Sequence, residues 1–422
     1  MFSSSPRLAE STPRSTRAPT DRRRAALLRR LLLLVVLLLA GLPLALWLAI
    51  PRVPWLGPMI ADNARSILGP AAVGRMEDIA YGIDDWWTRL WRSGDAPQSY
   101  WSVAQQPAPA SSFSAVAPSG PAPSSSGPLT AISPFRPADL PPMHRAMFAR
   151  GDGIWVPSAD PLHPDRPAPA FKTLLHPDLD RPWSTVAIVA LDLHRVRLTI
   201  VPGREDPKAT LAEAALLTRT GLIPAADQPS LLAAFNGGFK TIHGTLGMAV
   251  GPTTLIPPQK WGCTIAAYRD GSLAIRSWTE LAATRDDMLW WRQTPTCVVE
   301  LGELGAGVTA EGNINWGMSV EGSTIIRRSA IGLSRDGAVL FVGMGDATSA
   351  GSMAQAMKHA GAWNVAQLDV NTPYPKFLFF APSAPGSAEL AGQPLTPWMS
   401  CEPDDYVRRP SRRDFFYLTR MD

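Results

Sequence analysis

A short apolar run in the middle of the chain ends in residues that could bind an anion. Residues 231–235 (LLAAF) predict a buried strand, because the run is brief and stops at turn residues. The residues that follow are Asn236, Gly237 and Gly238, with Lys240 and His243 close behind. Asn and Gly tolerate left-handed backbone, so a sharp turn there can bring bare N–H groups to a ligand. Lys and His add a fixed and a titratable cation, which suits a phosphate or a carboxylate. A tight hairpin with a solvated lysine is the alternative.

Two later strand ends carry isolated carboxylates. Residues 339–344 predict a strand that ends shortly before Asp346 and a helix. A second predicted strand, residues 363–370, contains Asp369 and is followed by Asn371. Asp369 and Asn371 are two positions apart, so their side chains point to the same side if the strand continues that far. Each carboxylate either faces a ligand or is used by the chain itself, Asp346 as a helix cap and Asp369 by turn N–H groups.

Two adjacent arginines are a further candidate, and a tryptophan and a glutamate are weaker ones. Arg327 and Arg328 lead into a predicted strand, in which neighbouring side chains point to opposite faces, so at most one of them enters a site. Trp316 could stack on a sugar or fill the core, and Glu321 is a further carboxylate. No G-x-S-x-G, H-E-x-x-H, P-loop or dinucleotide-binding pattern occurs, which argues against the enzymes that depend on them.

Composition excludes several classes of protein. The 422 residues suffice for one large or two ordinary domains, and 45% hydrophobic residues with 15 Trp can form a sizeable core. The net charge is only +4 and much of the excess lies in residues 1–30, so nucleic-acid binding is not expected. Cys263, Cys297 and Cys401 contain no C-x-x-C pair, which argues against zinc. They allow one bridge, with Cys263–Cys297 preferred, or three free thiols.

The N-terminal region has the composition of a membrane anchor. Residues 1–30 are rich in Ser, Pro and Arg and are predicted to be disordered. Residues 31–50 are uncharged and apolar, and they have about the length needed to cross a ~30 Å hydrocarbon core. Because arginines precede this run, we expect a single-pass transmembrane helix with the N-terminus in the cytoplasm and the main domain in the periplasm or at the cell exterior. A cleaved signal peptide is the alternative.

Residues 59–92 and 98–142 connect the predicted anchor to the rest of the chain. The first segment has helical periodicity that is broken at Gly69-Pro70. One side of its second half is apolar and is expected to pack on the main domain rather than to lie on a membrane surface; its members are Met76, Ile79, Ile83, Trp86, Trp87 and Leu90. Residues 98–142 are mostly Pro, Ala and Ser and predict a semi-extended linker.

Residues 143–422 have a globular composition and form the predicted main domain. Strands outnumber helices here and Asp-Gly turns favour hairpins, which predicts an α+β fold, a single mixed domain rich in hairpins. The expected strands are residues 185–191, 195–201, 231–235, 246–250, 263–268, 273–277, 329–333, 339–344 and 363–370. The expected helices are residues 210–217 and 352–360, the second ended by Gly361.

Four short motifs occur in order within this domain. They are F-N-G-G-F at 235–239, R-S-A-I-G at 328–332, Asp346 before a helix, and L-D at 368–369. Over roughly residues 185–418 the chain thereby resembles the phosphodiester glycosidase family, that of the lysosomal uncovering enzyme, which removes N-acetylglucosamine from a phosphodiester. Better-known members have N-A-G-F-F and L-D-G-G-G-S, whereas V-N-T follows Asp369 here. The chain therefore resembles a bacterial branch with L-D-x-N, which also tends to end like R-D-F-F-Y at 413–417.

The resemblance implies a reaction and roles for the candidate residues. The leaving group of a sugar–phosphate bond is already a stable anion, so a cation on the phosphate and a carboxylate near the oxocarbenium-like centre matter more than a strong acid. Asp369 and Asp346 fit the catalytic carboxylates. The residues expected to bind substrate are Asn236, Gly237, Gly238, Lys240, His243, Arg328 and Asn371. A calcium or magnesium ion held by Asp346, Asp369 and Asn371 is a further expectation.

Two functions are compatible with these residues. The first is a membrane-anchored hydrolase outside the cytoplasm that cleaves a sugar-phosphodiester bond in envelope or exported glycans. The second is a non-catalytic glycan-binding module on a membrane stalk. The reason to consider it is that the Gly-rich run of the better-known family members is missing after Asp369. If the chain is an enzyme, Asn236, Arg328, Asp346 and Asp369 should share one cleft. It also predicts that Asp369→Asn stops turnover with little change in melting temperature.

Overall fold

The computed structural model describes residues 56–103, 135–305 and 323–421, together with residue 308 and a few positions between 29 and 53. Most of the predicted tail, anchor and linker, and both Trp316 and Glu321, lie outside the described residues. The chain divides into two compact units, Met1–Ile60 and Ala61–Asp422. The sheets and the candidate site belong to the second unit, and the predicted domain boundaries stay predictions.

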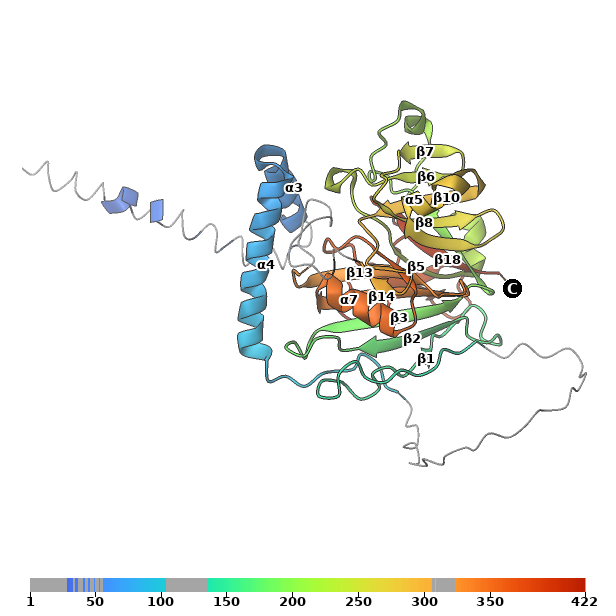
Figure 1. Ribbon diagram of the computed structural model, residues 1–422, viewed down its shortest axis with the longest axis horizontal. Coiled ribbons are helices and arrows are strands. Elements are labelled where there is room, and N and C mark those ends of the chain that lie inside the picture. The colour runs from blue at the N-terminus through green and yellow to red at the C-terminus, as the bar shows by residue number, and fades with distance from the viewer. Residues whose placement is uncertain are drawn as a thin grey trace, which may run out of the picture. The chain divides into compact units, whose positions relative to one another are not determined.

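An eight-stranded antiparallel sheet is the largest element of the second unit (Figure 1). Its strands in spatial order are β1 Val156–Pro157, β2 Ala170–Leu175, β3 Thr185–Asp192, β14 Val339–Thr348, β13 Ile326–Leu333, β15 Asn364–Gln367, β11 Val299–Glu300 and β12 Glu303–Leu304. One face of this sheet packs against helix α7, Ala350–His359, through Met353 and Met357. The central strand β3 is buried on both faces, which accounts for its almost continuous apolar sequence.

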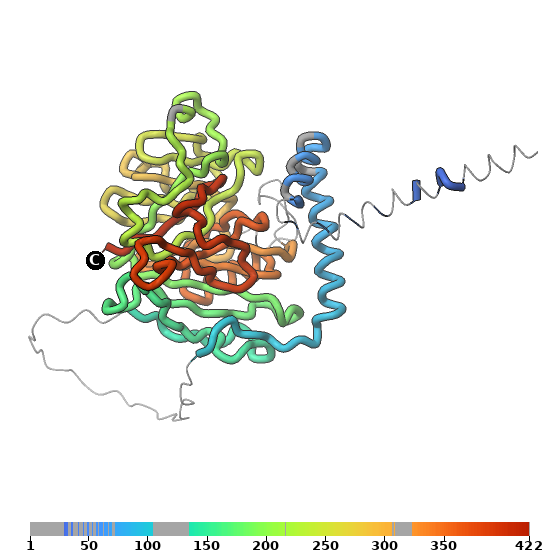
Figure 2. The backbone as a smooth tube through the Cα atoms, turned by 180° about the vertical axis from the view of Figure 1, so that it is seen from behind, coloured from blue at the N-terminus to red at the C-terminus, as the bar shows by residue number. Residues whose placement is uncertain are grey.

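Two five-stranded antiparallel sheets pack on the other side. The second sheet comprises β17 Leu390–Pro394, β16 Phe377–Pro382, β5 Leu231–Asn236, β18 Phe415–Arg420 and β4 Val196–Val201. The third comprises β7 Thr253–Ile256, β6 Met248–Val250, β10 Met288–Thr294, β8 Cys263–Tyr268 and β9 Leu273–Ser277. One cluster of buried side chains joins all three sheets and includes Val189, Phe416 and Ile265. The C-terminal segment, red in Figure 2, enters this arrangement as β18 between β5 and β4.

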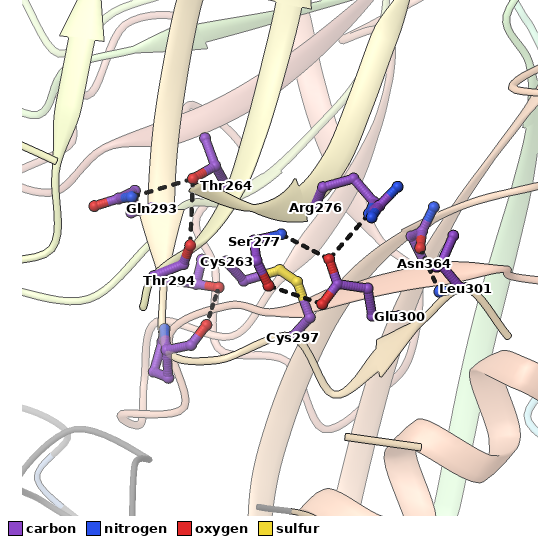
Figure 3. Close-up of a disulfide and its surroundings, with 12 residues drawn as sticks. Cys263, Thr264, Arg276, Ser277, Gln293, Thr294, Cys297, Glu300, Leu301 and Asn364 are labelled. Carbon is purple, nitrogen blue, oxygen red and sulfur yellow. Dashed lines mark hydrogen bonds and ion pairs between the residues drawn. A yellow bond between two sulfur atoms is a disulfide. The ribbon is translucent and has the colours of Figure 1, made fainter. Parts of the chain in front are cut away.

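A disulfide connects the third sheet to the edge of the first (Figure 3). Cys263 at the start of β8 is bonded to Cys297, two residues before β11. Beside it, Glu300 accepts hydrogen bonds from the Ser277 N–H at 2.8 Å and the Ser277 hydroxyl at 2.7 Å. The pairing preferred from the sequence is thus confirmed, and Cys401 is a free thiol.

The predicted α+β class is wrong, because the described part of the main domain is mainly β. Within residues 135–305 and 323–421, α7 is the only α-helix with more than about one turn, since α5 Trp278–Leu281 has four residues. The expected helix at 210–217 is a 3-10 turn, Ala212–Leu216. A segment this short needs an apolar face on the core to form a stable α-helix, and Ala214 supplies little apolar area. The other 3-10 turns are Ala225–Ser230, Thr241–His243 and Ala282–Asp287.

Two helices precede the main domain, and their break is where the sequence predicts it. Helix α3 spans Leu56–Leu68, helix α4 spans Pro70–Arg92, and Gly69 between them has φ 82°. The expected packing of the apolar side of α4 on the domain is wrong, however. Ile79 is 65% exposed and Leu90 is 59% exposed, while acidic side chains of α4 contact the domain.

The structure also contradicts the predicted membrane anchor. No helix among the described residues is both long enough and apolar enough to span a membrane. Helix α4 has 23 residues, but charged side chains occur throughout its length. The prediction of a single-pass helix over residues 31–50, with the domain on the far side of a membrane, is corrected accordingly. Most of residues 31–50 lie outside the described part of the chain.

Candidate functional site

Asn236 ends β5 and joins three segments. Its amide nitrogen donates to the Ser329 hydroxyl at 2.8 Å and to the Asp369 carbonyl at 3.3 Å. Its amide oxygen accepts from the Lys376 N–H at 3.2 Å. Because the buried side chain is occupied by partners within the chain, Asn236 positions the segment that carries Asp369.

Gly238 binds an anion that belongs to the chain itself, and Gly237 bonds to the backbone of the same residue. The Gly238 N–H donates to Asp414 Oδ2 at 2.9 Å, and the Gly237 N–H donates to the Asp414 carbonyl at 3.0 Å. A Cβ atom on Gly237 would lie 2.4 Å from Asp414 Oδ2, and one on Gly238 would lie 2.7 Å from Arg292 Cζ. Neither glycine has a positive φ, so the expected left-handed turn is not formed. Close packing, rather than backbone freedom, requires glycine here.

Asp414 and Arg292 form a buried ion pair beneath this turn. Arg292 Nε lies 2.9 Å from Asp414 Oδ2, and both side chains are at most 1% exposed. The remaining guanidinium N–H groups donate to the carbonyls of Phe239 at 2.6 Å, Leu246 at 2.9 Å and Gln293 at 3.0 Å. A buried pair is tolerated when such hydrogen bonds satisfy both charges, and this one links β10 to the start of β18.

Arg413 and Asp369 form a second buried ion pair. Adjacent side chains of an extended segment point in opposite directions, so Arg413 points away from Asp414 and toward Asp369 Oδ2, to which Nη1 donates. The guanidinium carbon lies 3.3 Å from the centroid of the Tyr374 ring. Asp369 Oδ1 accepts from the Asn371 N–H at 3.0 Å and from its side-chain amide at 2.5 Å. A cation and a carboxylate are thus held together at the junction of two sheets.

His243 lies near this pair in an unusual state for a buried histidine. It is 2% exposed on the 3-10 turn Thr241–His243, and neither ring nitrogen has a hydrogen-bond partner in the described part of the chain. Burial lowers the pKa of His243 to about 4, Asp369 opposes this shift, and cations that include Arg413 and Lys240 reinforce it. The ring is therefore neutral at pH 7, and Asp369, Arg413 and Lys240 all act on it.

A small cavity opens onto the ion pairs. Its lining residues are Asn236, Gly237, Gly238, Asp369, Tyr374, Tyr406, Ser411, Arg413 and Asp414. Its volume is about 10 Å³, which is room for about one water molecule. A sugar cannot enter this space, so a larger ligand must meet the cluster from outside or displace the side chains that close it.

Arg328 does not line this cavity. Its side chain is 1% exposed and donates to Gln367 Oε1 at 3.0 Å, to the Thr324 carbonyl at 2.8 Å and to the Thr348 carbonyl at 3.1 Å. Gln367 is the last residue of β15, two positions before Asp369. Arg328 therefore fixes the end of the strand that leads to Asp369, and it acts on the site by positioning that strand.

Asp346 belongs to a different pair. Its Oδ1 lies 3.1 Å from Arg327 Nε, and both side chains are 31% exposed. A register shift between Ile326 and Arg328 takes Arg327 out of the β13–β14 ladder, which lets its side chain reach Asp346. The two arginine side chains point in different directions, as expected. Arg327 is half-buried and pairs with Asp346, whereas Arg328 is buried.

The side chains as placed do not fit the predicted calcium or magnesium ion. Arg413 and Asn371 engage the two oxygens of Asp369, and Asn371 faces it with its amide nitrogen. Asp346 is paired with Arg327. Among the described residues, no group of three or more His, Cys, Asp or Glu side chains could hold a metal. We therefore derive no step through a cation, and the metal requirement stays a prediction.

The predicted site residues are only partly brought together. Asn236, Gly237, Gly238 and Asp369 line the cavity, Asn371 bonds to Asp369, and Lys240 and His243 lie near them, whereas Arg328 and Asp346 do not line it. Arg413, Asp414 and Tyr374 were not predicted as site residues. The predicted residues follow the ends of strands, whereas Arg413 and Asp414 precede the start of one. In an antiparallel pair the start of one strand lies beside the end of its neighbour, and Phe415 is indeed opposite Asn236.

Comparisons with known proteins give only slight similarities. No family model matches the chain, and no curated protein matches it. Among solved structures, the catalytic domain of zebrafish N-acetylglucosamine-1-phosphodiester alpha-N-acetylglucosaminidase, auto-inhibited by its pro-peptide, is similar at 14% identity and TM-score 0.38, over 63% of this chain and 87% of that one. A hypothetical protein from Synechocystis is similar at 12% identity and TM-score 0.33, over 56% of this chain and 59% of that one. These similarities are too slight to carry an argument, and nothing in them supports the L-D-x-N branch.

Proposed function

We propose that this protein is a hydrolase that cleaves a glycosyl phosphodiester. The observation that carries the proposal is the Asp369–Arg413 ion pair near His243, whose ring nitrogens have no partner in the described residues. A fixed cation can bind the phosphate, a carboxylate can stabilise positive charge on the sugar, and a neutral imidazole can accept a proton. Of the four residues expected to share one cleft, Arg328 and Asp346 do not line it, so the proposal rests on Asp369, Arg413 and His243 alone.

In the proposed reaction the substrate phosphate replaces Asp369 as the partner of Arg413. The freed carboxylate then faces the anomeric carbon of the sugar. The bond between this carbon and the phosphate oxygen breaks, and its electron pair leaves with the phosphomonoester. Water supplies the oxygen that bonds to this carbon, and neutral His243 accepts the proton that the water loses. The products are a free sugar and a phosphomonoester. Stacking on Tyr374 keeps the Arg413 guanidinium in place during the exchange.

The test is incubation of the full chain with a panel of sugar-1-phosphodiesters, followed by measurement of released sugar. We expect turnover with at least one of them, and loss of at least 100-fold in the Asp369→Asn variant. The structure changes the expected stability of this variant. Removing one charge of a buried pair leaves Arg413 without a counter-charge, which costs about 3–5 kcal/mol of unfolding free energy, so the melting temperature falls rather than staying constant.

Asp160→Asn is a matched control for that loss of stability. Asp160 and Arg420 form a comparably buried ion pair at the other end of β18, with side-chain exposures of 6% and 1% against 2% and 5% for Asp369 and Arg413. We expect this variant to be destabilised to a similar degree and to keep its turnover per folded molecule. Equal loss of turnover in both variants would show that stability, not the Asp369 cluster, limits activity.

Two further measurements separate the alternatives. Glycan binding without release of sugar from any substrate, in a wild-type chain shown to be folded, would favour the glycan-binding module instead. Assays with added calcium or magnesium and with a chelator test the predicted cation, which enters none of the steps above.

A further inference from the structure

Helix α4 carries a regular apolar stripe on its outer side. Its members are Met76, Ile79, Ile83, Trp86 and Leu90, exposed by 59, 65, 54, 56 and 59%, and their spacings alternate between three and four residues. Trp87 and Trp91, exposed by 53% and 69%, widen the stripe. No other side chain of the described residues covers it to any large extent. Such a row of exposed large side chains is unusual on a helix that has no further partner.

The opposite side of α4 fixes its orientation on the domain. Asp78 accepts from the Thr324 hydroxyl at 2.8 Å, and both oxygens of Asp85 accept from Arg181 at 2.7 Å. The Arg92 guanidinium lies 5.1 Å from the ring centroid of Trp183. Asp78, Asp85 and Arg92 are seven residues apart, so they form one line along the helix. This line contacts the domain, and the apolar stripe therefore points away from it.

We propose that this stripe is a dimer interface, on which α4 of a second copy packs in parallel as a short coiled coil. Spacings of three and four residues are the a and d positions of a heptad repeat, in which each side chain enters a hole on the facing helix. The stripe covers only two heptads, which is short for an isolated coiled coil. The helix is already formed and held on the domain, however, so association does not have to order it.

Charge and shape favour the parallel orientation. In an antiparallel pair Arg75 would lie beside Arg89 of the other copy, and like charges repel. In a parallel pair Arg75 lies beside Ala80, and Trp87 lies beside Gly82. A Cβ atom on Gly82 would meet nothing within 4 Å, so this position leaves a hole that a tryptophan ring can fill. The parallel arrangement therefore fits both the charges and the large side chains.

The size of the stripe is sufficient for a dimer. The exposed parts of its seven side chains amount to on the order of 800 Å² per copy, which matches the area per partner of a stable interface. A lipid surface fits less well. Helices that lie on membranes carry mainly Lys and Arg on their polar side, whereas here the acidic Glu77, Asp78, Asp84 and Asp85 outnumber the basic Arg75, Arg89 and Arg92. The interface is independent of the proposed hydrolysis.

Site-directed cross-linking of the full chain tests the orientation. In a Cys401→Ser background, Leu90→Cys places a thiol on the stripe and Thr88→Cys places one on the opposite side of the helix. Mild oxidation should link two Leu90→Cys chains, because identical positions face each other in a parallel pair. The Thr88→Cys chain should stay monomeric on a denaturing gel, although a maleimide still labels it. Failure of the Leu90→Cys chain to link would overturn the parallel dimer.

Sedimentation of the full chain tests whether the stripe supplies the affinity. We expect a concentration-dependent dimer whose dissociation constant rises at least 100-fold in Ile83→Lys, because the substitution places a charge at the centre of the interface. Arg75→Lys, at its edge and with the same charge, should change the constant by less than threefold. A wild-type chain that is monomeric at micromolar concentration, or that floats with phosphatidylcholine vesicles while staying monomeric, would overturn the proposal.

Discussion

At the residue scale, the neighbouring side chains of Arg413 and Asp414 belong to two different buried ion pairs. Asp414 pairs with Arg292 and with a glycine N–H and is fully engaged. Arg413 pairs with Asp369, while its Nε is buried and has no partner in the described residues. Buried polar atoms normally have partners, so an unmatched guanidinium N–H and an unmatched imidazole in one place favour a ligand or a water molecule there. This difference distinguishes the Asp369 cluster from the structural pair beneath it.

The pH dependence of stability tests the state of His243. Its pKa falls from the ordinary value near 6.5 to about 4 on folding. Between those values the unfolded chain binds a proton that the folded chain does not, so stability is fully present above pH 6.5 and is lost as the pH falls toward 4. The shift corresponds to about 3 kcal/mol. Urea unfolding at pH 7 and pH 4.5 should show most of this loss in the wild-type chain and little of it in His243→Gln.

His359→Gln is the control for that measurement. His359 lies at the exposed end of α7, where its ring bonds to the Pro141 carbonyl at 2.8 Å. We expect this substitution to leave unchanged the loss of unfolding free energy between pH 7 and pH 4.5. The buried, neutral state assigned to His243 would be contradicted if the His243→Gln chain lost as much stability on acidification as the wild type.

At the element scale, the site depends on where strands begin and end. β5 ends at Asn236, β15 ends at Gln367, and β18 begins at Phe415. The antiparallel pairing of β5 with β18 brings Arg413 and Asp414 to the end of β5, and the Asp369 N–H bonds to the Gly237 carbonyl at 3.1 Å. Three segments far apart in the sequence therefore deliver their polar groups to one junction between sheets.

The turn after β5 is predicted to tolerate no side chain. In Gly238→Ala the new Cβ would lie 2.7 Å from the guanidinium carbon of Arg292, which is buried and held by the Asp414 carboxylate and three backbone carbonyls. We expect a loss of about 1–3 kcal/mol in the free energy of unfolding, as for other overpacked cores. Urea denaturation measures it.

Gly94→Ala is the matched substitution in open space, since nothing lies within 4 Å of its Cβ position. It should change stability by less than about 0.5 kcal/mol. A Gly238→Ala chain as stable as Gly94→Ala would mean that Arg292 moves freely, and that the close packing described for this turn is not required.

At the scale of the whole molecule, three sheets share one core and depend on each other. The Arg292–Asp414 pair joins the third sheet to the second, and Asn236 joins the second to the first through Ser329. The disulfide adds a covalent link between the third sheet and the edge of the first. The domain should therefore unfold as one cooperative unit rather than sheet by sheet.

Removal of the disulfide tests this dependence. Cys263 and Cys297 are 34 residues apart, and closing a loop of that length stabilises a fold by about 4 kcal/mol through the unfolded state. The double variant Cys263→Ala, Cys297→Ala should lower the unfolding free energy by roughly this amount in a single transition. Cys401→Ala, which removes the free thiol, should have little effect. Two separate transitions in the double variant would show that the sheets fold independently.

The sequence by itself determined the local features of this protein. Apolar runs between turn residues predicted β5, the β8–β9 hairpin and the β13–β14 hairpin, and Gly69-Pro70 predicted the break between α3 and α4. These features depend on residues close together in the chain, whose conformational preferences act before any tertiary contact forms. The same reasoning overestimated the helix at 210–217, where the tertiary structure left too little apolar area to support it.

Only the tertiary structure decided which polar groups meet. Asp369 pairs with Arg413, 44 residues away, and Asn236 binds Ser329, 93 residues away. It also paired Asp346 with Arg327 and turned the apolar side of α4 outward. Sheet pairing and the packing of sheets bring such residues together, and neither is encoded in the spacing of residues along one strand. The physical reason is that a strand specifies its own faces but not its neighbours.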